Sequence, residues 1–556
     1  MAFVPTLDLH EHTLPGLLRR NAERLPDNDC IVAPEFGVCW SWKEFDRRTS
    51  EVARGMYAMG IRKGDHVAIW STNTPEWMLT MFASAKLGAI LVTVNTNYKQ
   101  FELNYLLNQS DTKMLVMTAG VKNNDYISHI TGLVPALNTE QPDNISCKQL
   151  PFLKRVLLIG DSERRPMGMS RFDDLYEAAK SVPESVVEES IAGLDTHETI
   201  NMQYTSGTTG LPKGAVFSQE AMVNRAQADV EGMRFSRDDI MLFVLPFYHV
   251  TCVSVFAVLL VGAQMVIGQS NKAPDIVSYV NRYGVTRVGL VPYHMRTLAA
   301  YVEAEHVTVD TLKLVIYGAE PAGPALLSRC RALLECDFLQ GYGMTETASS
   351  VTVLLPEHHK DPRLLETAGV PLPGVEIRIV DEEGRVCPPG TSGEVVVKTN
   401  TLMLGYWNDL DQTARVVKDG WYYTEDIGFV DEDGFLTLVD RKNNLVITGG
   451  ENVYPLEVSR CIASLGACIA DVAVTGVPDE RWGESLVAFV VRAPGAAVTE
   501  EDIVAHCADE LGHYKKPKRV VFVDDLQRKS SGKVPKERLD ELVAAYVTGK
   551  DDHGRL

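Results

Sequence analysis

Hydrophobic and polar positions alternate with two different periods along the first part of the chain. Apolar residues recur at helical spacing in segment 41–61, whereas "GDHVAIWS" at 64–71 is a short apolar run typical of a buried strand. Segment 75–95 combines a helix with a following strand, and the same alternation returns in segment 287–335. Repeated strand–helix alternation predicts an α/β protein whose parallel sheets are covered by helices.

From about Gly374 the pattern changes to hairpins. Segments 375–399 and 428–447 each join two apolar runs through acidic turns that contain glycine. These changes predict one large N-terminal domain (1–442), which divides into α/β layers (1–373) and a β-rich, barrel-like part (374–442). A small α+β C-terminal domain (443–545) and a tail (546–556) follow.

The longest apolar run, "VTCVSVFAVLLVGAQMVIG" at 250–268, nearly reaches membrane-spanning length. Thr251, Ser254, Gly262 and Gln264 interrupt it, so we expect a buried helix followed by a buried strand. The start of the chain lacks the basic and apolar regions of a signal peptide. We therefore expect a cytoplasmic protein that is not an integral membrane protein.

The net charge and the cysteine pattern indicate which partners and which cellular environment the protein has. The 556 residues carry a formal net charge of −20, which disfavours binding to nucleic acid or to an anionic membrane. The 10 cysteines form no CxxC pair, as expected for reduced thiols in an intracellular protein. A homodimer is one assembly that the sequence allows.

The stretch "QYTSGTTGLPKGAV" at 203–216 has the composition of an anion-binding loop. Glycines let backbone N–H groups approach phosphate oxygens, hydroxyls add donors, and Lys213 adds positive charge. It is not a Walker A loop, because Pro212 precedes the lysine and Gly214 follows it. From composition alone, a flexible surface loop is an equal alternative.

The order of residues in this stretch resembles the adenylate-forming superfamily of acyl-CoA synthetases, luciferases and peptide-synthetase adenylation domains. Further motifs of the family follow in order along nearly the whole chain, and within the family they look most like medium-chain fatty-acyl-CoA synthetases and related acyl- and aryl-CoA ligases. These motifs are "LPFYHV" (Leu245–Val250), "YGAEP" (Tyr317–Pro321), "QGYGMTET" (Gln340–Thr347), "GYW" (Gly405–Trp407), "DIGFVDEDGFLTLVDR" (426–441), "ITGGENVYPLEV" (447–458) and "SSGKVPKERL" (530–539).

The resemblance implies an acid–thiol ligase that uses ATP, Mg²⁺ and coenzyme A. A carboxylic acid would attack the α-phosphate of ATP, pyrophosphate would leave, and the acyl-adenylate would react with CoA. The substrate oxygen is itself the nucleophile, so no catalytic serine or cysteine is required; what is required is charge stabilisation and alignment.

The resemblance also assigns roles to individual residues. It implies catalytic roles for Lys533, Thr205, Glu346 and His249, with Glu346 also helping to bind Mg²⁺. The implied ATP- and AMP-binding residues are Ser206, Gly207, Thr208, Thr209, Gly210, Lys213, Gly318, Ala319, Glu320, Gly341, Tyr342, Gly343, Met344, Thr345, Asp426 and Arg441. The implied acyl-pocket residues are His249, Val253, Gly289, Gly318 and Gly343. For His249, a core histidine without a catalytic role is the alternative.

The resemblance implies a mobile C-terminal domain that works in two poses. Lys533 would serve adenylation, and Gly449, Gly450 and Glu451 would then border the path of CoA. The expected hinge residue is Asn443, where the family usually has aspartate or lysine, and asparagine offers different hydrogen bonds and no charge. This departure puts the thioester step in doubt.

Several rival functions follow from the same sequence. The acyl-adenylate could pass to a carrier-protein thiol or a partner enzyme instead of CoA. A luciferase-like oxygenase would use the same fold but has no positive indication here. A non-catalytic nucleotide-binding protein predicts loss of Lys533, Glu346 or Asp426, and all three are present. A membrane fatty-acid transporter would rest on the 250–268 run alone.

Overall fold

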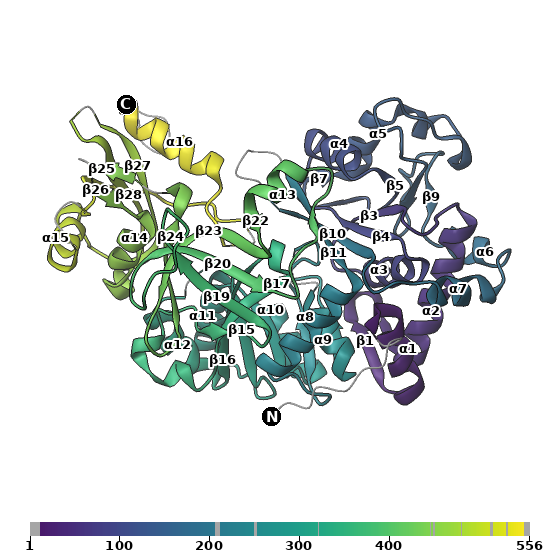
Figure 1. Ribbon diagram of the computed structural model, residues 1–556, viewed down its shortest axis with the longest axis horizontal. Coiled ribbons are helices and arrows are strands. Elements are labelled where there is room, and N and C mark those ends of the chain that lie inside the picture. The colour runs from purple at the N-terminus through teal and green to yellow at the C-terminus, as the bar shows by residue number, and fades with distance from the viewer. Residues whose placement is uncertain are drawn as a thin grey trace.

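In this computed structural model, the described residues are 12–205, 212–249, 253–320, 322–444, 446–448, 451–479, 481–511, 515–529 and 532–549. For residues 144, 443, 447, 451 and 452 the description covers the backbone alone. Figure 1 shows two large sheets in the N-terminal region, a hairpin-rich part (375–441) and, beside that hairpin-rich part, the C-terminal part.

The first large sheet has nine strands in the order β18-β17-β16-β15-β14-β12-β13-β1-β2. The inner strands pair in parallel, whereas β1–β2, β16–β17 and β17–β18 pair antiparallel at the two edges. Its strands are β1 (Asp29–Ala33), β2 (Val38–Ser41), β12 (Ile240–Phe243), β13 (Gln264–Ile267), β14 (Arg287–Leu290), β15 (Leu314–Gly318), β16 (Asp337–Met344), β17 (Ser349–Leu354) and β18 (Val370–Pro371).

The second large sheet has eight strands in the order β21-β11-β10-β4-β3-β5-β8-β9. It is parallel from β10 to β9 and antiparallel at β10–β11 and β11–β21. Its strands are β3 (His66–Trp70), β4 (Ile90–Thr93), β5 (Thr112–Met117), β8 (Arg155–Leu158), β9 (Ser170–Arg171), β10 (Thr199–Thr205), β11 (Lys213–Ser218) and β21 (Gly405–Tyr406).

Two smaller sheets follow along the chain. One joins β19 (Val375–Val380), β20 (Gly393–Thr399), β22 (Val417–Lys418), β23 (Trp421–Val430) and β24 (Leu436–Arg441), all antiparallel. The C-terminal sheet joins β25 (Val446–Thr448), β26 (Glu451–Val453), β27 (Ile469–Asp479), β28 (Gly483–Arg492) and β29 (Arg519–Phe522), with β28–β29 parallel. A separate hairpin pairs β6 (Gly120–Val121) with β7 (Asn124–Asp125).

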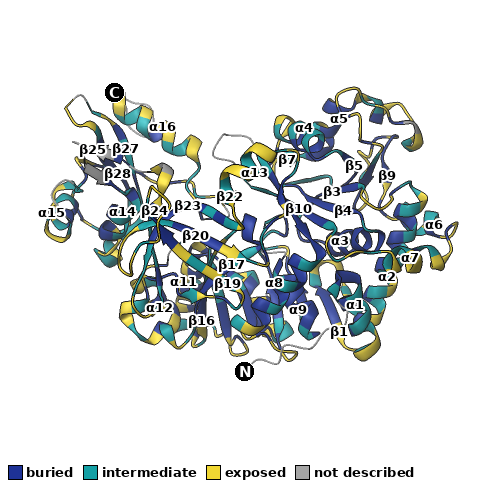
Figure 2. Cartoon of the chain, in the orientation of Figure 1, coloured by how far each residue is buried: buried dark blue, intermediate teal, exposed yellow. Residues whose placement is uncertain are grey.

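Helices cover the faces of the large sheets, and the strands between them are buried (Figure 2). In the large N-terminal region they are α1 (Leu14–Arg24), α2 (Trp42–Ala58), α3 (Pro75–Leu87), α4 (Gln100–Gln109), α5 (Tyr126–Leu133), α6 (Asp174–Ala179), α7 (Glu184–Ala192), α8 (Gln219–Gly232), α9 (Ser254–Val261), α10 (Ala273–Tyr283), α11 (Pro292–Glu305), α12 (Pro324–Leu334) and α13 (Leu410–Val416). The C-terminal part adds α14 (Pro455–Ala463), α15 (Glu500–Glu510) and α16 (Lys536–Val547).

Periodicity predicted these elements well. Segment 41–61 contains α2, with the Ser41 hydroxyl accepting a hydrogen bond from the Glu44 N–H at the helix start. Segment 75–95 contains α3 and β4, as expected. The predicted α/β class is confirmed. Both large sheets end in antiparallel strands, however, and the sequence pattern did not distinguish these from the parallel strands. The domain limits remain predictions.

The apolar run at 250–268 is part of the core. Within its described residues, α9 and β13 form the expected helix and strand, and α9 is buried over six consecutive positions from Val255 to Leu260. Asn21 on α1 donates to the Leu259 carbonyl at 2.6 Å. Among the described residues, no helix is both long and apolar enough to cross a membrane. The cytoplasmic location stays a prediction.

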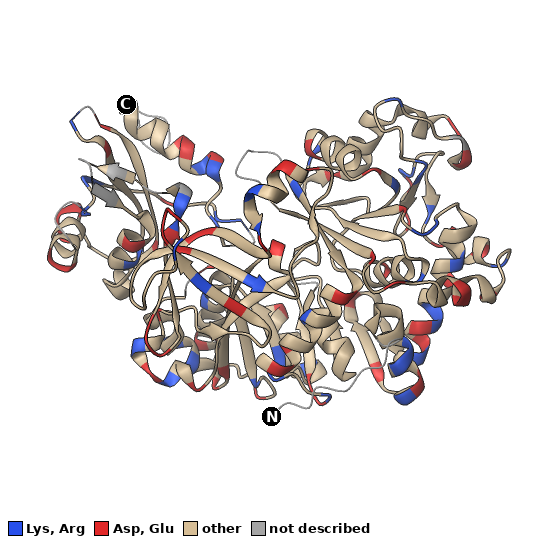
Figure 3. Cartoon of the chain, in the orientation of Figure 1, with Lys and Arg blue, Asp and Glu red and all other residues tan. Residues whose placement is uncertain are grey.

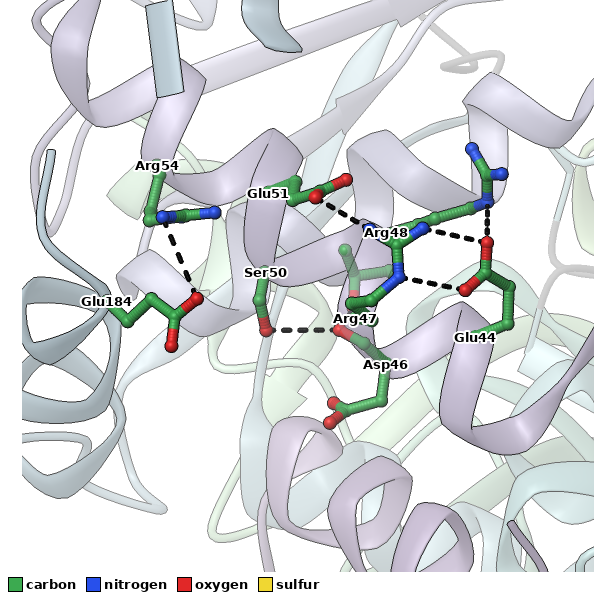
Figure 4. Close-up of polar contacts among 9 residues, drawn as sticks. Glu44, Asp46, Arg47, Arg48, Ser50, Glu51, Arg54 and Glu184 are labelled. Carbon is green, nitrogen blue, oxygen red and sulfur yellow. Dashed lines mark hydrogen bonds and ion pairs between the residues drawn. The ribbon is translucent and has the colours of Figure 1, made fainter. Parts of the chain in front are cut away.

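Residues of both charge signs are interspersed on the outer helices, and others lie on loops and hairpin strands (Figure 3). On α2, the Arg47 guanidinium contacts the carboxylates of Glu44 and Glu51 at 2.8 and 2.6 Å (Figure 4). Arg54 reaches Glu184 on α7 at 3.9 Å. Such exposed pairs each contribute about 1 kcal/mol or less, so packing of the buried faces holds these helices.

Candidate active site

Three glycines form a flat backbone surface at the carboxyl ends of β15 and β16. Gly318 and Gly341 are register partners, and a Cβ on Gly318 would lie 2.4 Å from the Gly341 carbonyl oxygen. A Cβ on Gly343 would lie 2.0 Å from the Ser349 oxygen. Side chains are therefore excluded here, and Ala319 follows with φ +70°. A planar ring could lie against such a surface.

Tyr342, Asp426 and Arg441 meet at this surface. The Tyr342 hydroxyl donates to Asp426 Oδ2 at 2.6 Å, and Arg441 Nε lies 3.1 Å from Asp426 Oδ1. Asp426 on β23 and Arg441 on β24 are cross-strand partners, so the hairpin itself brings them together. Burial, then the charge of Asp426, raises the pKa of Tyr342 well above its ordinary value, so its hydroxyl stays protonated.

Glu346 lies in a second polar group beside the predicted phosphate loop. The Tyr406 hydroxyl donates to Glu346 Oε1 at 2.7 Å, and Glu346 is 8% exposed. Lys213 Nζ lies 5.2 Å from the Tyr406 ring centre and donates to Gln412 at 3.1 Å. Thr205 is the cross-strand partner of Lys213 at the base of the loop. Ser206, Gly207, Thr208, Thr209 and Gly210 lie outside the described residues.

The surroundings of Glu346 fit a magnesium ion bound together with a ligand. Its carboxylate supplies the oxygen donors that Mg²⁺ prefers, and within the described part of the chain Tyr406 contacts Oε1 alone. Within the described part of the chain there is no cluster of three or more His, Cys, Asp or Glu that could hold a metal. Ligand phosphates would therefore have to complete the coordination.

Lys533 lies close to both groups, although it comes from the C-terminal part. Its pKa is lowered, first because the surrounding protein displaces water and second because Arg441 repels it. The carboxylates of Asp426, Glu346 and Glu320 act in the opposite direction. One cation from the end of the chain thus shares a site with three acids of the N-terminal region.

His249 belongs to the same neighbourhood. Burial, then the charge of Lys533, lowers its pKa to about 4, so the ring is neutral at neutral pH. Its ring centre lies 4.2 Å from that of Tyr248, and the two ring planes are tilted by 42°. A neutral ring beside Lys533 suits the lining of an acyl pocket, the role predicted for it, and adds no charge there.

Two further predicted acyl-pocket residues, Val253 and Gly289, lie at α9 and on β14 of the N-terminal region. Val253 is fully buried at the start of α9, and Gly289 lies within β14. A Cβ on Gly289 would meet nothing nearer than Met241 Cε at 3.7 Å, so this glycine keeps space open. The acyl-pocket role of these residues remains a prediction.

The predicted CoA-side and hinge residues are described less completely. Gly449 and Gly450 lie outside the described residues, and Glu451 begins β26, its backbone alone being described. Asn443 lies in a short 3₁₀ turn, Lys442–Asn444, directly after β24. The linker position expected for Asn443 therefore coincides with a break between two sheets.

Two residues with clear contacts in the site were not predicted individually. Tyr406, which donates to Glu346, lies inside the "GYW" motif, so the motif gave the location without the role. Arg528 has no predicted role in the site, yet its guanidinium lies 3.5 Å from Glu320. Sequence reasoning missed it because the contact joins residues 208 positions apart.

Comparison with known proteins identifies the family. The model of the AMP-binding enzyme family matches residues 18–407, and that of the AMP-binding enzyme C-terminal domain matches residues 457–533. The chain belongs to this family of adenylate-forming, acyl-CoA synthetase-like enzymes, as its motifs suggested.

Individual relatives match over nearly their full length. "Putative acyl-CoA synthetase YngI" of Bacillus subtilis is 35% identical, covering 96% of this chain and 97% of the relative. "Fatty acid--[acyl-carrier-protein] ligase ScoC" of Streptomyces coeruleorubidus is 30% identical, covering 96% and 97%. The structure of ATP-bound MatB from Rhodopseudomonas palustris superposes with a TM-score of 0.80 at 28% identity, covering 95% of this chain and 98% of MatB.

Asp426 should be required for nucleotide binding. We expect Asp426→Asn to weaken AMP binding about 10- to 100-fold, because hydrogen bonds to a charged acceptor contribute about 1.5–3 kcal/mol each. Isothermal titration calorimetry with AMP measures this. The control is Asp431→Asn in the same hairpin, where the carboxylate caps its own turn through the N–H groups of Asp433 and Phe435. Equal affinity in both variants would contradict the assignment.

Proposed function

We propose that the protein is an ATP-dependent acyl-CoA synthetase that converts a fatty or aryl carboxylic acid into an acyl-adenylate and then into an acyl-CoA thioester. The observation that carries this proposal is the packing of Gly532 against Glu320, which brings the adjacent Lys533 to the wall of the site, within range of the charges of Arg441, Asp426 and Glu346. A carboxylate and an α-phosphate repel each other, and a cation between them offsets that repulsion.

Adenylation forms one bond and breaks another at phosphorus. A carboxylate oxygen of the substrate attacks the α-phosphorus of ATP, and the bond to the bridging oxygen of pyrophosphate breaks, so that pyrophosphate leaves. Lys533 stabilises the charge that builds up on the α-phosphate oxygens, and Thr345 contacts the same phosphate. No side chain has to act as a nucleophile.

The strands position the nucleotide for this step. Adenine lies between the Tyr342 ring and the backbone of Gly318–Glu320, and Asp426 accepts hydrogen bonds from both ribose hydroxyls. Arg441 gives a second ribose or phosphate contact, and the Thr205–Lys213 segment holds the β- and γ-phosphates. Mg²⁺, held by Glu346 together with phosphate oxygens, would neutralise the charge of the departing pyrophosphate.

Thioester formation requires a second arrangement of the same chain. The C-terminal domain rotates about Asn443, withdraws Lys533 and brings the Gly449–Glu451 segment to the acyl-adenylate. The CoA thiolate attacks the carbonyl carbon and AMP leaves. Support comes from relatives such as YngI, whose name gives acyl-CoA synthetase activity.

A second acceptor competes with CoA in this proposal. ScoC, 30% identical to this chain, carries the name of a fatty acid–acyl-carrier-protein ligase. Transfer to a carrier-protein thiol uses the same adenylate, so the first half-reaction does not separate the two. The identity of the thioester product does.

The experiment that tests the function is pyrophosphate release across a panel of carboxylic acids, followed by product analysis with CoA or with a phosphopantetheinylated carrier protein. Acid-dependent pyrophosphate release and acyl-CoA formation support the proposal. Acyl-carrier product without acyl-CoA supports the second acceptor. Absence of pyrophosphate release with every acid would reject adenylation.

Lys533 should act in adenylation and not in thioester formation. We expect Lys533→Ala to lower carboxylate-dependent ATP–pyrophosphate exchange by roughly two to three decades, as for other groups that stabilise transition-state charge. Conversion of a supplied acyl-adenylate to acyl-CoA should stay near normal. Lys529→Ala is the matched control, since the Lys529 side chain is exposed and lies 3.8 Å from Glu537. Normal exchange in Lys533→Ala would refute the role.

Asn443 should slow the thioester step. If the second pose costs a few kcal/mol, it is populated at roughly 1% or below, and acyl-adenylate accumulates even with saturating CoA. Asn443→Asp and Asn443→Lys should raise the rate of thioester formation without raising pyrophosphate exchange. Stopped-flow quantification of both products checks this. CoA consumption that keeps pace with pyrophosphate release in the unmodified protein would show that the hinge is unimpaired.

A further inference from the structure

Arg528 joins the C-terminal part to the wall of the nucleotide site. Its Nε and Nη2 donate to the two carboxylate oxygens of Asp471, each at 2.8 Å, and Nη2 also donates to the Val472 carbonyl at 3.1 Å. Its Nη1 donates to the Gly532 carbonyl at 2.8 Å and lies 3.5 Å from Glu320 Oε2. A planar guanidinium can satisfy all these partners at once, which a lysine ammonium cannot.

The loop that carries Lys533 rests directly on Glu320. Gly532 has φ +82°, and a Cβ there would lie 2.6 Å from the Glu320 carboxyl carbon. The Lys529 N–H donates to the Lys533 carbonyl, and the Gly532 N–H donates to the Lys529 carbonyl, both at 2.8 Å. Because these bonds tie Lys529, Gly532 and Lys533 to one another next to Arg528, a shift of Arg528 shifts Lys533.

Other contacts between the two parts lie beside the linker. The Leu456 N–H donates to Asp440 Oδ2 at 2.7 Å, and Arg460 Nη1 donates to the Leu438 carbonyl at 2.9 Å. Those contacts are close to the hinge. The Glu320–Arg528 ion pair lies at a different place in the C-terminal part, next to the segment that carries Lys533.

The environment of Glu320 favours such a pairing. The carboxylate side chain is 18% exposed, and that of Arg528 is 24% exposed. Burial raises the pKa of Glu320 to about 7, and the Arg528 charge opposes this rise. Asp471 raises it further, whereas Arg296 on α11 lowers it. A half-buried carboxylate with a raised pKa is stabilised in its charged form by a close cation.

We propose that Glu320, Arg528 and Asp471 form an interdomain anchor, in which Arg528 is the positioning residue that places Lys533 for adenylation. Asp471 orients the guanidinium, the Gly532 carbonyl couples it to the lysine loop, and Glu320 receives it across the interface. The anchor rests on the proposed two-pose function, and it must break before the C-terminal domain rotates for thioester formation.

The test compares both half-reactions in Arg528→Gln and Asp471→Asn. We expect ATP–pyrophosphate exchange to fall about 10- to 100-fold in kcat, because a small misplacement of a catalytic group has this cost. The KM for ATP should stay within about threefold, since the nucleotide contacts remain. Conversion of a supplied acyl-adenylate to acyl-CoA should be unchanged or faster, an opposite effect that general destabilisation would not produce.

Two further variants sharpen the comparison. Arg519→Gln is the matched control, because Arg519 pairs with Glu500 at 2.9 Å inside the C-terminal part and should behave as the unmodified protein does. Arg528→Lys keeps the positive charge but loses the planar guanidinium with its five N–H donors. This variant should therefore retain ATP–pyrophosphate exchange only in part. Hydrogen–deuterium exchange of peptides containing Glu320 and Arg528 should rise in Arg528→Gln and not in Arg519→Gln.

The outcomes separate failure of the anchor from failure of the function. Unaltered exchange kinetics in Arg528→Gln, or an equal loss in both half-reactions, would overturn the anchor. If the unmodified protein shows no acid-dependent pyrophosphate exchange, the proposed function fails. Deuterium uptake then decides alone whether Arg528 holds the interface, and unchanged uptake in Arg528→Gln would overturn that as well.

Discussion

The cross-strand pair of Asp426 and Arg441 is the constraint on which the rest of the site depends. The hairpin of β23 and β24 sets the two residues side by side, and Tyr342 from the first large sheet completes the group through its 2.6 Å hydrogen bond. Arg441 ends β24, and the linker turn begins at the next residue. A single hairpin thus fixes both the acceptor for a ligand and the point from which the C-terminal part extends.

Charge explains why these groups gather in a protein of net charge −20. Lys213, Arg441 and Lys533 come from three distant segments and approach a common region. The acids of that region are Asp426, Glu346 and Glu320. The lowered pKa of Lys533 reflects first the cost of removing its ammonium group from water and second the cost of placing it near Arg441. An anionic ligand would remove that cost, so the local field favours a phosphate-bearing ligand while the overall charge repels polyanions such as nucleic acids.

Local patterns were sufficient to predict the helices and strands, because each pattern arises within a few residues. Segment 250–268 shows this well, since polar interruptions and a glycine separated a buried helix from a membrane span. The antiparallel edges of both large sheets were not predicted, because an edge strand and an inner strand can share the same apolar pattern. Motif order located Asp426, Glu346 and Lys533, whereas Tyr406 and Arg528 emerged only from contacts between distant segments. The roles assigned to Ser206–Gly210 and to Gly449–Gly450 stay predictions.

The contacts within the N-terminal region are of a different kind from those that join it to the C-terminal part. This difference suits the proposed movement of the C-terminal part between two poses. Asp426, Tyr342 and Glu346 lie on or next to strands packed into large cores, so their geometry does not depend on the C-terminal part. The segment that carries Lys533 is held beside them by a contact of a different kind, the half-buried ion pair of Arg528 with Glu320 at 3.5 Å next to Gly532. Such a pair is strong enough to orient a loop and weak enough to break on a functional timescale, because water can replace both partners as they separate. A fully buried pair would bind the C-terminal part more tightly and would make release of Lys533 the slow step of the cycle.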